Sequence, residues 1–313
     1  MKQIAIVTGA SRGIGYALTL ELAKRGVNVI ATARSTAELQ TLQDHAKNQI
    51  QIVMGDIRSE VVLNQIERLL KKSGNIDHLY LVNNAATPYP IASLEDIERN
   101  DFISSMQTNV EAPHSLAKKI KLKLSNSNGR ILNITSYAGS HPTPGAGVYC
   151  MTKAAFNQLS DLMRLEWGKE IAVTRVIPGE VDTKMQEEVR NSTHPIKEFA
   201  LATKENNLLI SPDVCAAFLT WLLLDTQRDE FSAKEMWNIY DNTHHSHWKK
   251  EGMKIPEPIK EEQKTTNAAR NNFSEKNSVA QLTSSAALYG ASNTKNQSSS
   301  KAEQDIQLTI GMR

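Results

Sequence analysis

Cysteine, aromatic residues and net charge are all scarce in this chain. It has 2 Cys among 313 residues, 5% Phe, Trp and Tyr, and a formal charge of +2 from 36 Lys and Arg against 34 Asp and Glu. Two cysteines argue against a disulfide framework and suit a reducing compartment. The near balance of charge excludes a generally basic protein that binds nucleic acid through its overall field.

Long apolar runs are missing too. The longest candidate, Phe218–Leu224, is far shorter than the roughly 18 residues that span a bilayer. The apolar start Ile4–Val7 stops at Thr8, which is too early for the core of a secretory signal. A hydrophobic content of 40% nevertheless suffices for a buried core. We therefore expect a cytoplasmic protein with no membrane segment and no nucleic-acid partner.

The last 61 residues differ from the rest. Between Met253 and Arg313, 24 residues are Ser, Thr, Asn or Gln, and 8 Lys and Arg face 6 Asp and Glu, so this tail alone carries the net charge. The sequence predicts one domain over residues 1–252 and a polar, disordered extension over 253–313. The alternative is an interaction module, with Asp305–Ile310 as a short strand-like recognition element.

Short apolar runs alternate with helix-length segments before this tail. The apolar runs predict strands at Gln3–Val7, Asn28–Thr32, Ile50–Met54, His78–Val82, Gly129–Ile134, Ile171–Val176 and Lys234–Tyr240. The longer segments predict helices at Ile14–Arg25, Ala37–Ala46, Glu60–Lys72, Asp96–Lys123, Lys153–Lys169 and Pro212–Leu224. Such alternation is typical of a single α/β domain of the Rossmann type, a doubly wound parallel sheet with helices on both faces. The segment Lys184–Ser211 is expected to be irregular and to form a substrate lid; an ordinary surface connection is the alternative.

A glycine-rich loop follows the first predicted strand and leads into the first helix. Glycines allow a tight turn and a close approach of phosphate, and the helix N-terminus offers free N–H groups and partial positive charge. We expect this loop to bind the pyrophosphate of a dinucleotide through Gly9, Ser11, Arg12, Gly13, Ile14 and Gly15.

The end of the second predicted strand indicates which dinucleotide. A carboxylate there would bind the ribose 2′-hydroxyl of NAD, but the chain reads Ala31-Thr32-Ala33-Arg34. Arg12 in the glycine loop offers a second cation. Guanidinium groups form charge-assisted, often bidentate bonds with phosphate, so we expect NADP (as NADPH) as the cofactor. Arginines that are merely solvated are the alternative.

The order of the motifs resembles that of the short-chain dehydrogenases/reductases, in their compact subfamily. The resemblance covers about residues 1–250 and rests on Thr8–Gly15, Asn83-Asn84-Ala85-Ala86, Ser136, Tyr149-x3-Lys153 and Pro178-Gly179. It implies a catalytic tetrad of Asn109, Ser136, Tyr149 and Lys153. Trp237–Asp241 leans towards the sepiapterin and benzil reductase branch, while Ala86 and Met151-Thr152 depart from the family's usual residues.

These residue types suit the reduction of a carbonyl. Hydride transfer to the carbonyl carbon leaves an oxygen that needs a proton, and Tyr149 can donate it. Lys153 lies one helical turn further on, so its charge is expected to lower the pKa of Tyr149. Ser136 can orient the substrate oxygen. By resemblance, Lys153 also binds the nicotinamide ribose, and Asn109 holds a water that relays protons to Lys153.

The resemblance implies further cofactor contacts, at Asp56, Ile57, Asn83, Ala85, Pro178, Gly179, Val181 and Thr183. It also implies a homodimer or homotetramer through the helices around Val110–Leu122 and Lys153–Trp167. Specificity is expected from Tyr89, from the segment His141–Pro144 and from the lid. No metal is expected, because His244, His245 and His247 lack acidic or cysteine companions.

Each catalytic position also has an ordinary interpretation. A Tyr and a Lys four residues apart are usually surface neighbours, and a Ser after a strand or an Asn before a helix is commonly a cap. The sequence thus predicts an NADPH-dependent reductase of a ketone, aldehyde or diketone. The alternative function is a non-enzymatic NADP-binding regulator or scaffold on the same fold.

Overall fold

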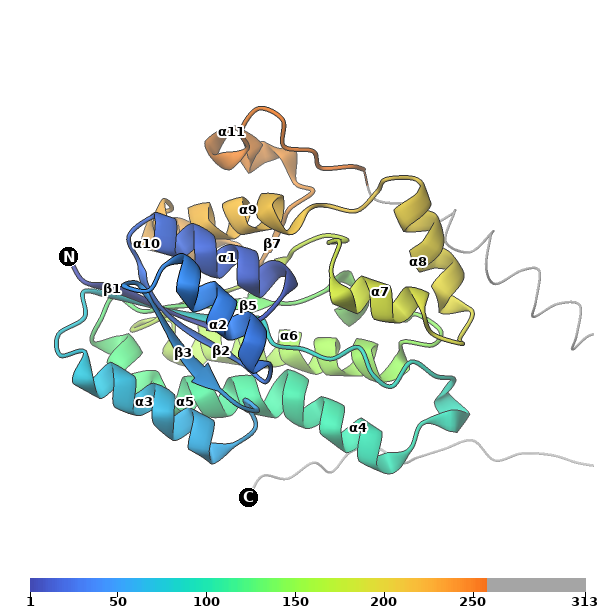
Figure 1. Cartoon of the computed structure of the whole chain (residues 1–313), viewed down its shortest axis with the longest axis horizontal. Coiled ribbons are helices and arrows are strands. Elements are labelled where there is room, and N and C mark those ends of the chain that lie inside the picture. Colours follow the sequence, from blue (N-terminus) through green and yellow to red (C-terminus); the bar gives the residue numbers. More distant parts are fainter. Residues whose placement is uncertain (258–313) are drawn as a thin grey trace, which may run out of the picture. The chain divides into compact units, whose positions relative to one another are not determined.

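The computed structural model describes residues 1–257. Its centre is a seven-stranded parallel sheet in the order β3-β2-β1-β4-β5-β6-β7 (Figure 1). The strands are β1 Gln3–Thr8, β2 Asn28–Ala33, β3 Ile50–Met54, β4 His78–Asn83, β5 Arg130–Ile134, β6 Ala172–Ile177 and β7 Met236–Asn238. The predicted doubly wound α/β sheet is confirmed.

Strand β1 lies at the point where the strand order reverses. It pairs with β2 through Ile4 to Thr8 and with β4 through Gln3 to Val7, both in parallel. The chain winds outwards from β1 in one direction to β3, and from β4 in the other direction to β7. Ligands of open α/β sheets bind beyond the carboxyl ends of the strands at such a reversal.

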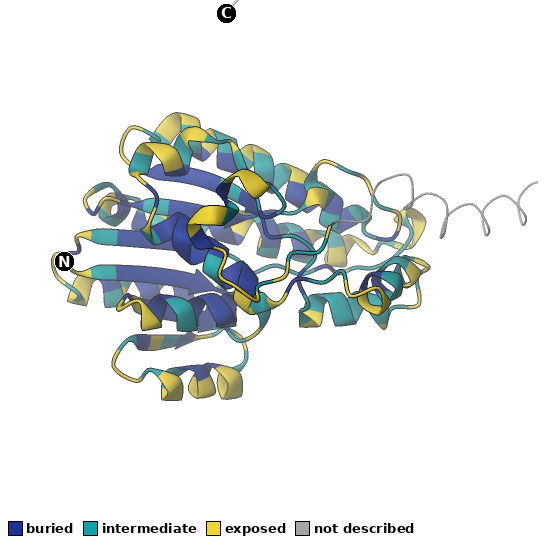
Figure 2. Ribbon diagram, turned by 90° about the horizontal axis from the view of Figure 1, so that it is seen from above, coloured by how far each residue is buried: buried dark blue, intermediate teal, exposed yellow. Residues whose placement is uncertain are grey.

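Helices cover both faces of the sheet and bury two separate apolar clusters. Helices α1 Gly13–Lys24, α2 Thr36–His45 and α9 Pro212–Leu224 pack on one face. Helices α3 Glu60–Lys72, α5 Ala112–Ser125 and α6 Gly147–Trp167 pack on the other. Figure 2 shows the result: the strands are buried throughout most of their length, while the outer sides of the helices are exposed.

Two helices begin where the sequence places a serine. The Ser59 hydroxyl accepts a hydrogen bond from the Val61 N–H and starts α3, and Ser211 accepts from the Val214 N–H and starts α9. Pro212 follows Ser211 in the first turn, where its missing N–H leaves no helical bond unmade. The bounds of both helices agree with the prediction because the caps are encoded locally.

The prediction of one long helix over Asp96–Lys123 is wrong, because the structure divides this segment into several elements. The chain forms a 3₁₀ turn η1 Leu94–Asp96, then α4 Arg99–Met106, then a π-helical turn η2 Gln107–Glu111 that runs into α5. Pro113 has no N–H to donate to the Asn109 carbonyl four residues earlier, so ordinary α-helical bonding is interrupted there.

The prediction that Lys184–Ser211 is irregular is also wrong. Residues 184–211 contain two helices, α7 Lys184–Arg190 and α8 Ile196–Glu205, which lie beyond the carboxyl ends of the strands (Figure 1). Pro195 directly precedes α8 as its N-cap residue, and the helix buries its own Ala200 and Thr203.

After α9, the chain forms α10 Arg228–Ala233, β7, the 3₁₀ turn η4 Asn242–His244 and α11 His245–Trp248. Met253 and Ile255, at the start of the predicted extension, pack against the core, and residues 258–313 with Asp305–Ile310 lie outside the described part. Within residues 1–257, no helix is both long and apolar enough to cross a bilayer.

Candidate active site

The glycine loop joins β1 to α1, as predicted. Gly9 and Gly13 have φ of +67° and +57°, a backbone region that side chains with a Cβ rarely adopt. A Cβ on Gly15 would lie 2.4 Å from the Gly9 carbonyl oxygen and 2.6 Å from Asn84 Nδ2. The loop is therefore folded tightly on itself and leaves the first N–H groups of α1 free to bind an anion.

Thr8 and Asn84 fasten this loop to the end of β4. The Thr8 hydroxyl accepts from the N–H groups of Asn84 and Ala85, both at 3.0 Å. Asn84 Nδ2 donates to the carbonyls of Thr8, at 2.8 Å, and Gly9, at 3.2 Å. The sequence analysis selected Asn83 and Ala85 and missed the roles of Asn84 and Thr8.

Asn83 supports the centre of the sheet, as the resemblance implies. Its Nδ2 donates to Asn133 Oδ1 at 2.8 Å, and Asn133 donates to Ser160 on α6 at 2.9 Å, with all three residues buried. Successive side chains at the end of a strand point to opposite sides. This alternation was the signal that separates the role of Asn83 from that of Asn84.

The residues expected to contact the adenosine part of the cofactor differ in their exposure and in their partners. Arg34 is exposed just after β2, and within residues 1–257 it forms no ion pair. Arg12, directly before α1, donates to Glu188 of α7 at 3.0 Å. Asp56, expected to contact the adenine, is bound through both oxygens by Arg58 at 2.6–3.0 Å, and these hydrogen bonds lower the pKa of the Asp56 carboxyl.

Tyr149, Lys153 and Ser136 come together beneath the loops at the carboxyl edge of the sheet. Tyr149 is half-buried in the first turn of α6, and Ser136, which follows β5, is close enough to lower its pKa. Lys153 is only 3% exposed; its Nζ donates to the Ile134 carbonyl at 2.9 Å and lies 5.6 Å from the centre of the Tyr149 ring. Ser136 also caps the turn η3 Tyr137–Gly139, so the ordinary interpretation of this serine holds as well.

The acid–base properties differ from the expectation for this pair. Burial raises the pKa of Tyr149 to about 12, and the hydrogen bond from Ser136 offsets only part of that rise. Burial lowers the pKa of Lys153 from 10.5 to about 8. In the protein alone, the pKa of Tyr149 is thus raised by the removal of water and not lowered by Lys153, contrary to the prediction.

Asn109 lies in the π-helical turn η2 and is not a helix cap. Its side chain is buried, accepts from the Thr87 N–H at 2.9 Å and donates to the Thr87 carbonyl at 2.9 Å. It also donates to the hydroxyl of Thr152, the residue before Lys153, at 3.0 Å. Asn109 therefore joins the loop after β4 to the turn of α6 that carries Lys153.

The segment after β6 closes the site from the other side. Gly179 has φ +82°, and a Cβ there would lie 2.6 Å from Ile210 Cδ1 and 3.1 Å from Tyr240 Cζ. The Tyr240 hydroxyl accepts from the Glu180 N–H at 3.0 Å. Thr183, at the start of α7, contacts the glycine loop, because a Cβ on Gly13 would lie 2.9 Å from Thr183 Cγ2. The contacts of Tyr240 were missed by the sequence analysis.

The remaining expected contacts, Ile57, Val181 and Pro178, lie at the ends of β3 and β6, with Ile57 and Val181 buried. Residues 184–211 meet the loop before α6 where the His194 imidazole lies against the backbone of Gly145, whose φ is +82°. Cys150 is buried, and its Sγ lies 3.7 Å from the His141 carbonyl oxygen.

The C-terminal histidines have structural partners. His244 is buried, its Nδ1 accepts from Trp248 Nε1 at 2.9 Å, and its Nε2 faces the Asn238 carbonyl at 3.0 Å. His245 Nε2 faces the Ile239 carbonyl at 2.7 Å. Among residues 1–257, no group of three His, Cys, Asp or Glu side chains is placed to hold a metal ion.

A Rossmann-type sheet with a glycine loop at the reversal of strand order defines a dinucleotide-binding protein. A family model described as short chain dehydrogenase matches residues 3–194. The chain belongs to the short-chain dehydrogenase/reductase family, a family of oxidoreductases that bind a nicotinamide cofactor.

Three comparisons illustrate the range of similar proteins. The chain is 29% identical over 249 residues to a benzil reductase of Bacillus cereus, covering 75% of this chain and 98% of that protein. It is 30% identical over 183 residues to an NADPH-dependent pterin aldehyde reductase of Arabidopsis thaliana, covering 58% and 75%. A solved serine dehydrogenase complexed with NADP+ is 26% identical, with a TM-score of 0.66, covering 76% and 94%.

Proposed function

We propose that the chain is an NADPH-dependent reductase of ketones, aldehydes or diketones. The observation that supports it best is the placement of Tyr149 close to both Ser136 and the buried Lys153, whose Nζ lies 5.6 Å from the centre of the Tyr149 ring. Because burial raises the pKa of Tyr149, its hydroxyl stays protonated across the neutral range and is a proton donor. Relatives whose names describe reduction of a diketone and of an aldehyde agree with this proposal.

The residues present fit NADP. The cradle formed by Gly9 and Gly15 has no room for a Cβ, as close approach of a pyrophosphate requires. Arg34 and Arg12 would bind the 2′-phosphate. The end of β2 carries no carboxylate that would repel this phosphate. The other positions that would line the cofactor are Ser11, Gly13, Ile14, Asp56, Ile57, Asn83, Ala85, Pro178, Gly179, Val181 and Thr183.

When bound, NADPH supplies the hydride that reduces the carbonyl carbon. Ser136 donates a hydrogen bond to the carbonyl oxygen and orients it. Tyr149 gives its phenolic proton to the same oxygen, so the product is an alcohol and the residue is left as a tyrosinate. Lys153, whose Nζ lies 5.6 Å from the centre of the Tyr149 ring, stabilises the tyrosinate and returns a proton, for which a pKa of about 8 is well matched. Asn109 positions the turn of α6 that bears Lys153.

The test is the consumption of NADPH and NADH with a panel of carbonyl compounds. Tyr149→Phe should lower kcat by about 10²- to 10⁴-fold, because the proton donor is lost, and should leave NADPH binding intact. Tyr80→Phe is the matched control, since Tyr80 is also buried but donates to Gln3 near the start of the sheet. Full activity of Tyr149→Phe would refute the proposal, and tight NADPH binding without turnover in the wild type would favour a regulator.

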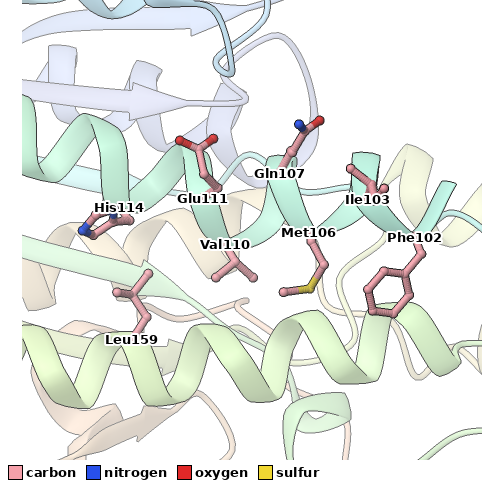
Figure 3. Close-up of a pocket in the computed structure, with 8 residues that line it drawn as sticks. All are labelled: Phe102, Ile103, Met106, Gln107, Val110, Glu111, His114 and Leu159. Carbon is pink, nitrogen blue, oxygen red and sulfur yellow. The ribbon is translucent and has the colours of Figure 1, made fainter. Parts of the chain in front are cut away.

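We also propose self-association through the outer face of α4, α5 and α6. Large apolar side chains are exposed there, at Ile103, Leu122, Leu162 and Leu165. Between α4–η2 and α6 lies an apolar hollow of about 470 Å³. Figure 3 shows Phe102, Met106 and Val110 pointing into it from one side and Leu159 from the other. Apolar surface of this kind favours a second copy of the chain as its partner.

A further inference from the structure

An ion pair connects the glycine loop to the lid. Arg12 Nη2 lies 3.0 Å from Glu188 Oε1, and the two side chains are 54% and 17% exposed. Among the described residues, this is the one hydrogen bond of the Arg12 guanidinium, so its other N–H donors remain available. The residue that the proposed function assigns to the 2′-phosphate thus already holds a carboxylate of α7.

The neighbouring polar groups of α7 are directed elsewhere. Glu187 pairs with Lys184 of the same helix at 2.6 Å, and Gln186 donates to Glu180 at 2.6 Å. Arg190 lies 3.8 Å from Asp182. Within residues 1–257, Glu188 is therefore the α7 side chain that forms an ion pair with the glycine loop, next to the packing contact between Thr183 and Gly13.

We propose that Glu188 is a specificity-determining residue for the cofactor and that it couples the cofactor to the lid. A phosphate carries more negative charge than a carboxylate and accepts bidentate bonds from guanidinium. A cofactor with a 2′-phosphate therefore binds Arg12 in place of Glu188. The ion pair that connects α7 to the glycine loop is then broken. A cofactor without that phosphate leaves the pair intact. The inference rests on the proposed use of Arg12 for the 2′-phosphate.

The physical basis is competition for one cation. The partly exposed Arg12–Glu188 pair is screened by solvent, so it is weak enough to be displaced. Arg34, which forms no ion pair among residues 1–257, supplies the second positive charge that the phosphate meets and the carboxylate does not. The carboxylate of Glu188 accordingly reduces, without abolishing, the preference for the phosphorylated cofactor.

The test uses two fragments on the full-length protein, adenosine 2′,5′-bisphosphate and adenosine 5′-monophosphate, measured by calorimetry. Glu188→Gln should tighten binding of the bisphosphate by about two- to fivefold, the range expected from an exposed ion pair, and leave the monophosphate unchanged. Glu187→Gln removes the same charge from the same helix and leaves the Arg12–Glu188 contact in place; because Arg12 acts on Glu187 only at longer range, this variant should change bisphosphate binding less than Glu188→Gln and leave the monophosphate unchanged. Hydrogen exchange of residues 184–190 should rise with the bisphosphate in the wild type and should not respond to it in Glu188→Gln.

Several results would overturn the inference. In calorimetry, these are weaker or unchanged bisphosphate binding in Glu188→Gln, an equal effect of Glu187→Gln, or no bisphosphate binding at all. In hydrogen exchange, it is an exchange rate of α7 in the wild type that does not change when the bisphosphate binds. The fragments contain no nicotinamide and undergo no reaction. An absence of carbonyl reduction would therefore refute the proposed activity while the fragment measurements still decide the role of Glu188.

Discussion

Replacement of Lys153 by methionine should abolish activity and yet stabilise the folded protein at neutral pH. Lys153 is almost completely buried, and within residues 1–257 its Nζ forms one hydrogen bond, to the Ile134 carbonyl. Methionine fills a similar volume without a charge. The change therefore removes a buried cation and one hydrogen bond while it keeps most of the packing.

The size of the effect follows from the pKa of Lys153. A fall from 10.5 to about 8 corresponds to about 3 kcal/mol of folding free energy, at about 1.4 kcal/mol for each tenfold change in the protonation equilibrium. Leaving the Ile134 carbonyl without its donor costs about 1–3 kcal/mol in return. We expect Lys153→Met to be more stable than the wild type by about 1 kcal/mol at pH 7.

The pH dependence identifies the cause. The folded pKa lies below the unfolded one, so the penalty is full below pH 8 and disappears as the pH rises from about 8 to 10.5. Tyr149, whose pKa is raised, destabilises the folded state only above its ordinary value of 10.0. Urea unfolding at pH 7 and pH 9.5 should show the advantage of Lys153→Met falling by about 2 kcal/mol over that window.

The control is Lys72→Met, since Lys72 is exposed in the last turn of α3 and should change stability by no more than about 0.5 kcal/mol at either pH. Burial also raises the pKa of the Cys215 thiol, but that effect is common to wild type and variant and cancels in the difference. A difference between Lys153→Met and wild type that stays constant from pH 7 to 9.5 would refute the reasoning.

Two further changes test other parts of the structure. Asn84→Ala removes both side-chain bonds to the carbonyls of Thr8 and Gly9, so unfolding in urea should show a loss of about 1–3 kcal/mol together with a higher KM for NADPH; an unchanged stability would contradict the proposed fastening of the glycine loop. Leu165→Glu places a charge on a side chain that is 76% exposed on α6, so sedimentation should show a smaller assembly at unchanged stability; an unchanged assembly size would contradict self-association through this face.

The sheet and most helices were predictable because their signals are local. Apolar runs of Ile and Val mark the buried strands, and Ser59 and Ser211 mark the starts of α3 and α9. The interruption at η2 depends on one missing N–H at Pro113 within an otherwise helical pattern. The helices α7 and α8 were missed because they are short and lie in a polar segment with a proline between them.

The candidate site was predictable in its residue types and less so in its contacts. The sequence places Ser136, Tyr149 and Lys153 on the right elements, and the structure brings them together. It contains no signal that Glu188 reaches Arg12, 176 residues earlier in the chain. The sequence also does not reveal how far Tyr149 and Lys153 are buried, because burial depends on segments that are distant in the chain, and this burial sets the pKa of both groups.

The central position of β1 determines when the N-terminal part of the chain can fold during synthesis. Strand β1 pairs with β4 on one side, the Thr8 hydroxyl accepts from the Asn84 N–H, and α1 packs against α9. A nascent chain that has delivered the glycine loop therefore lacks the partners of that loop until Asn84 has left the ribosome, and α1 lacks its neighbour until Leu224 has followed. Contacts this distant in sequence make folding slow. An N-terminal fragment that ends before β4 has the phosphate-binding motif but not the structure that shapes it.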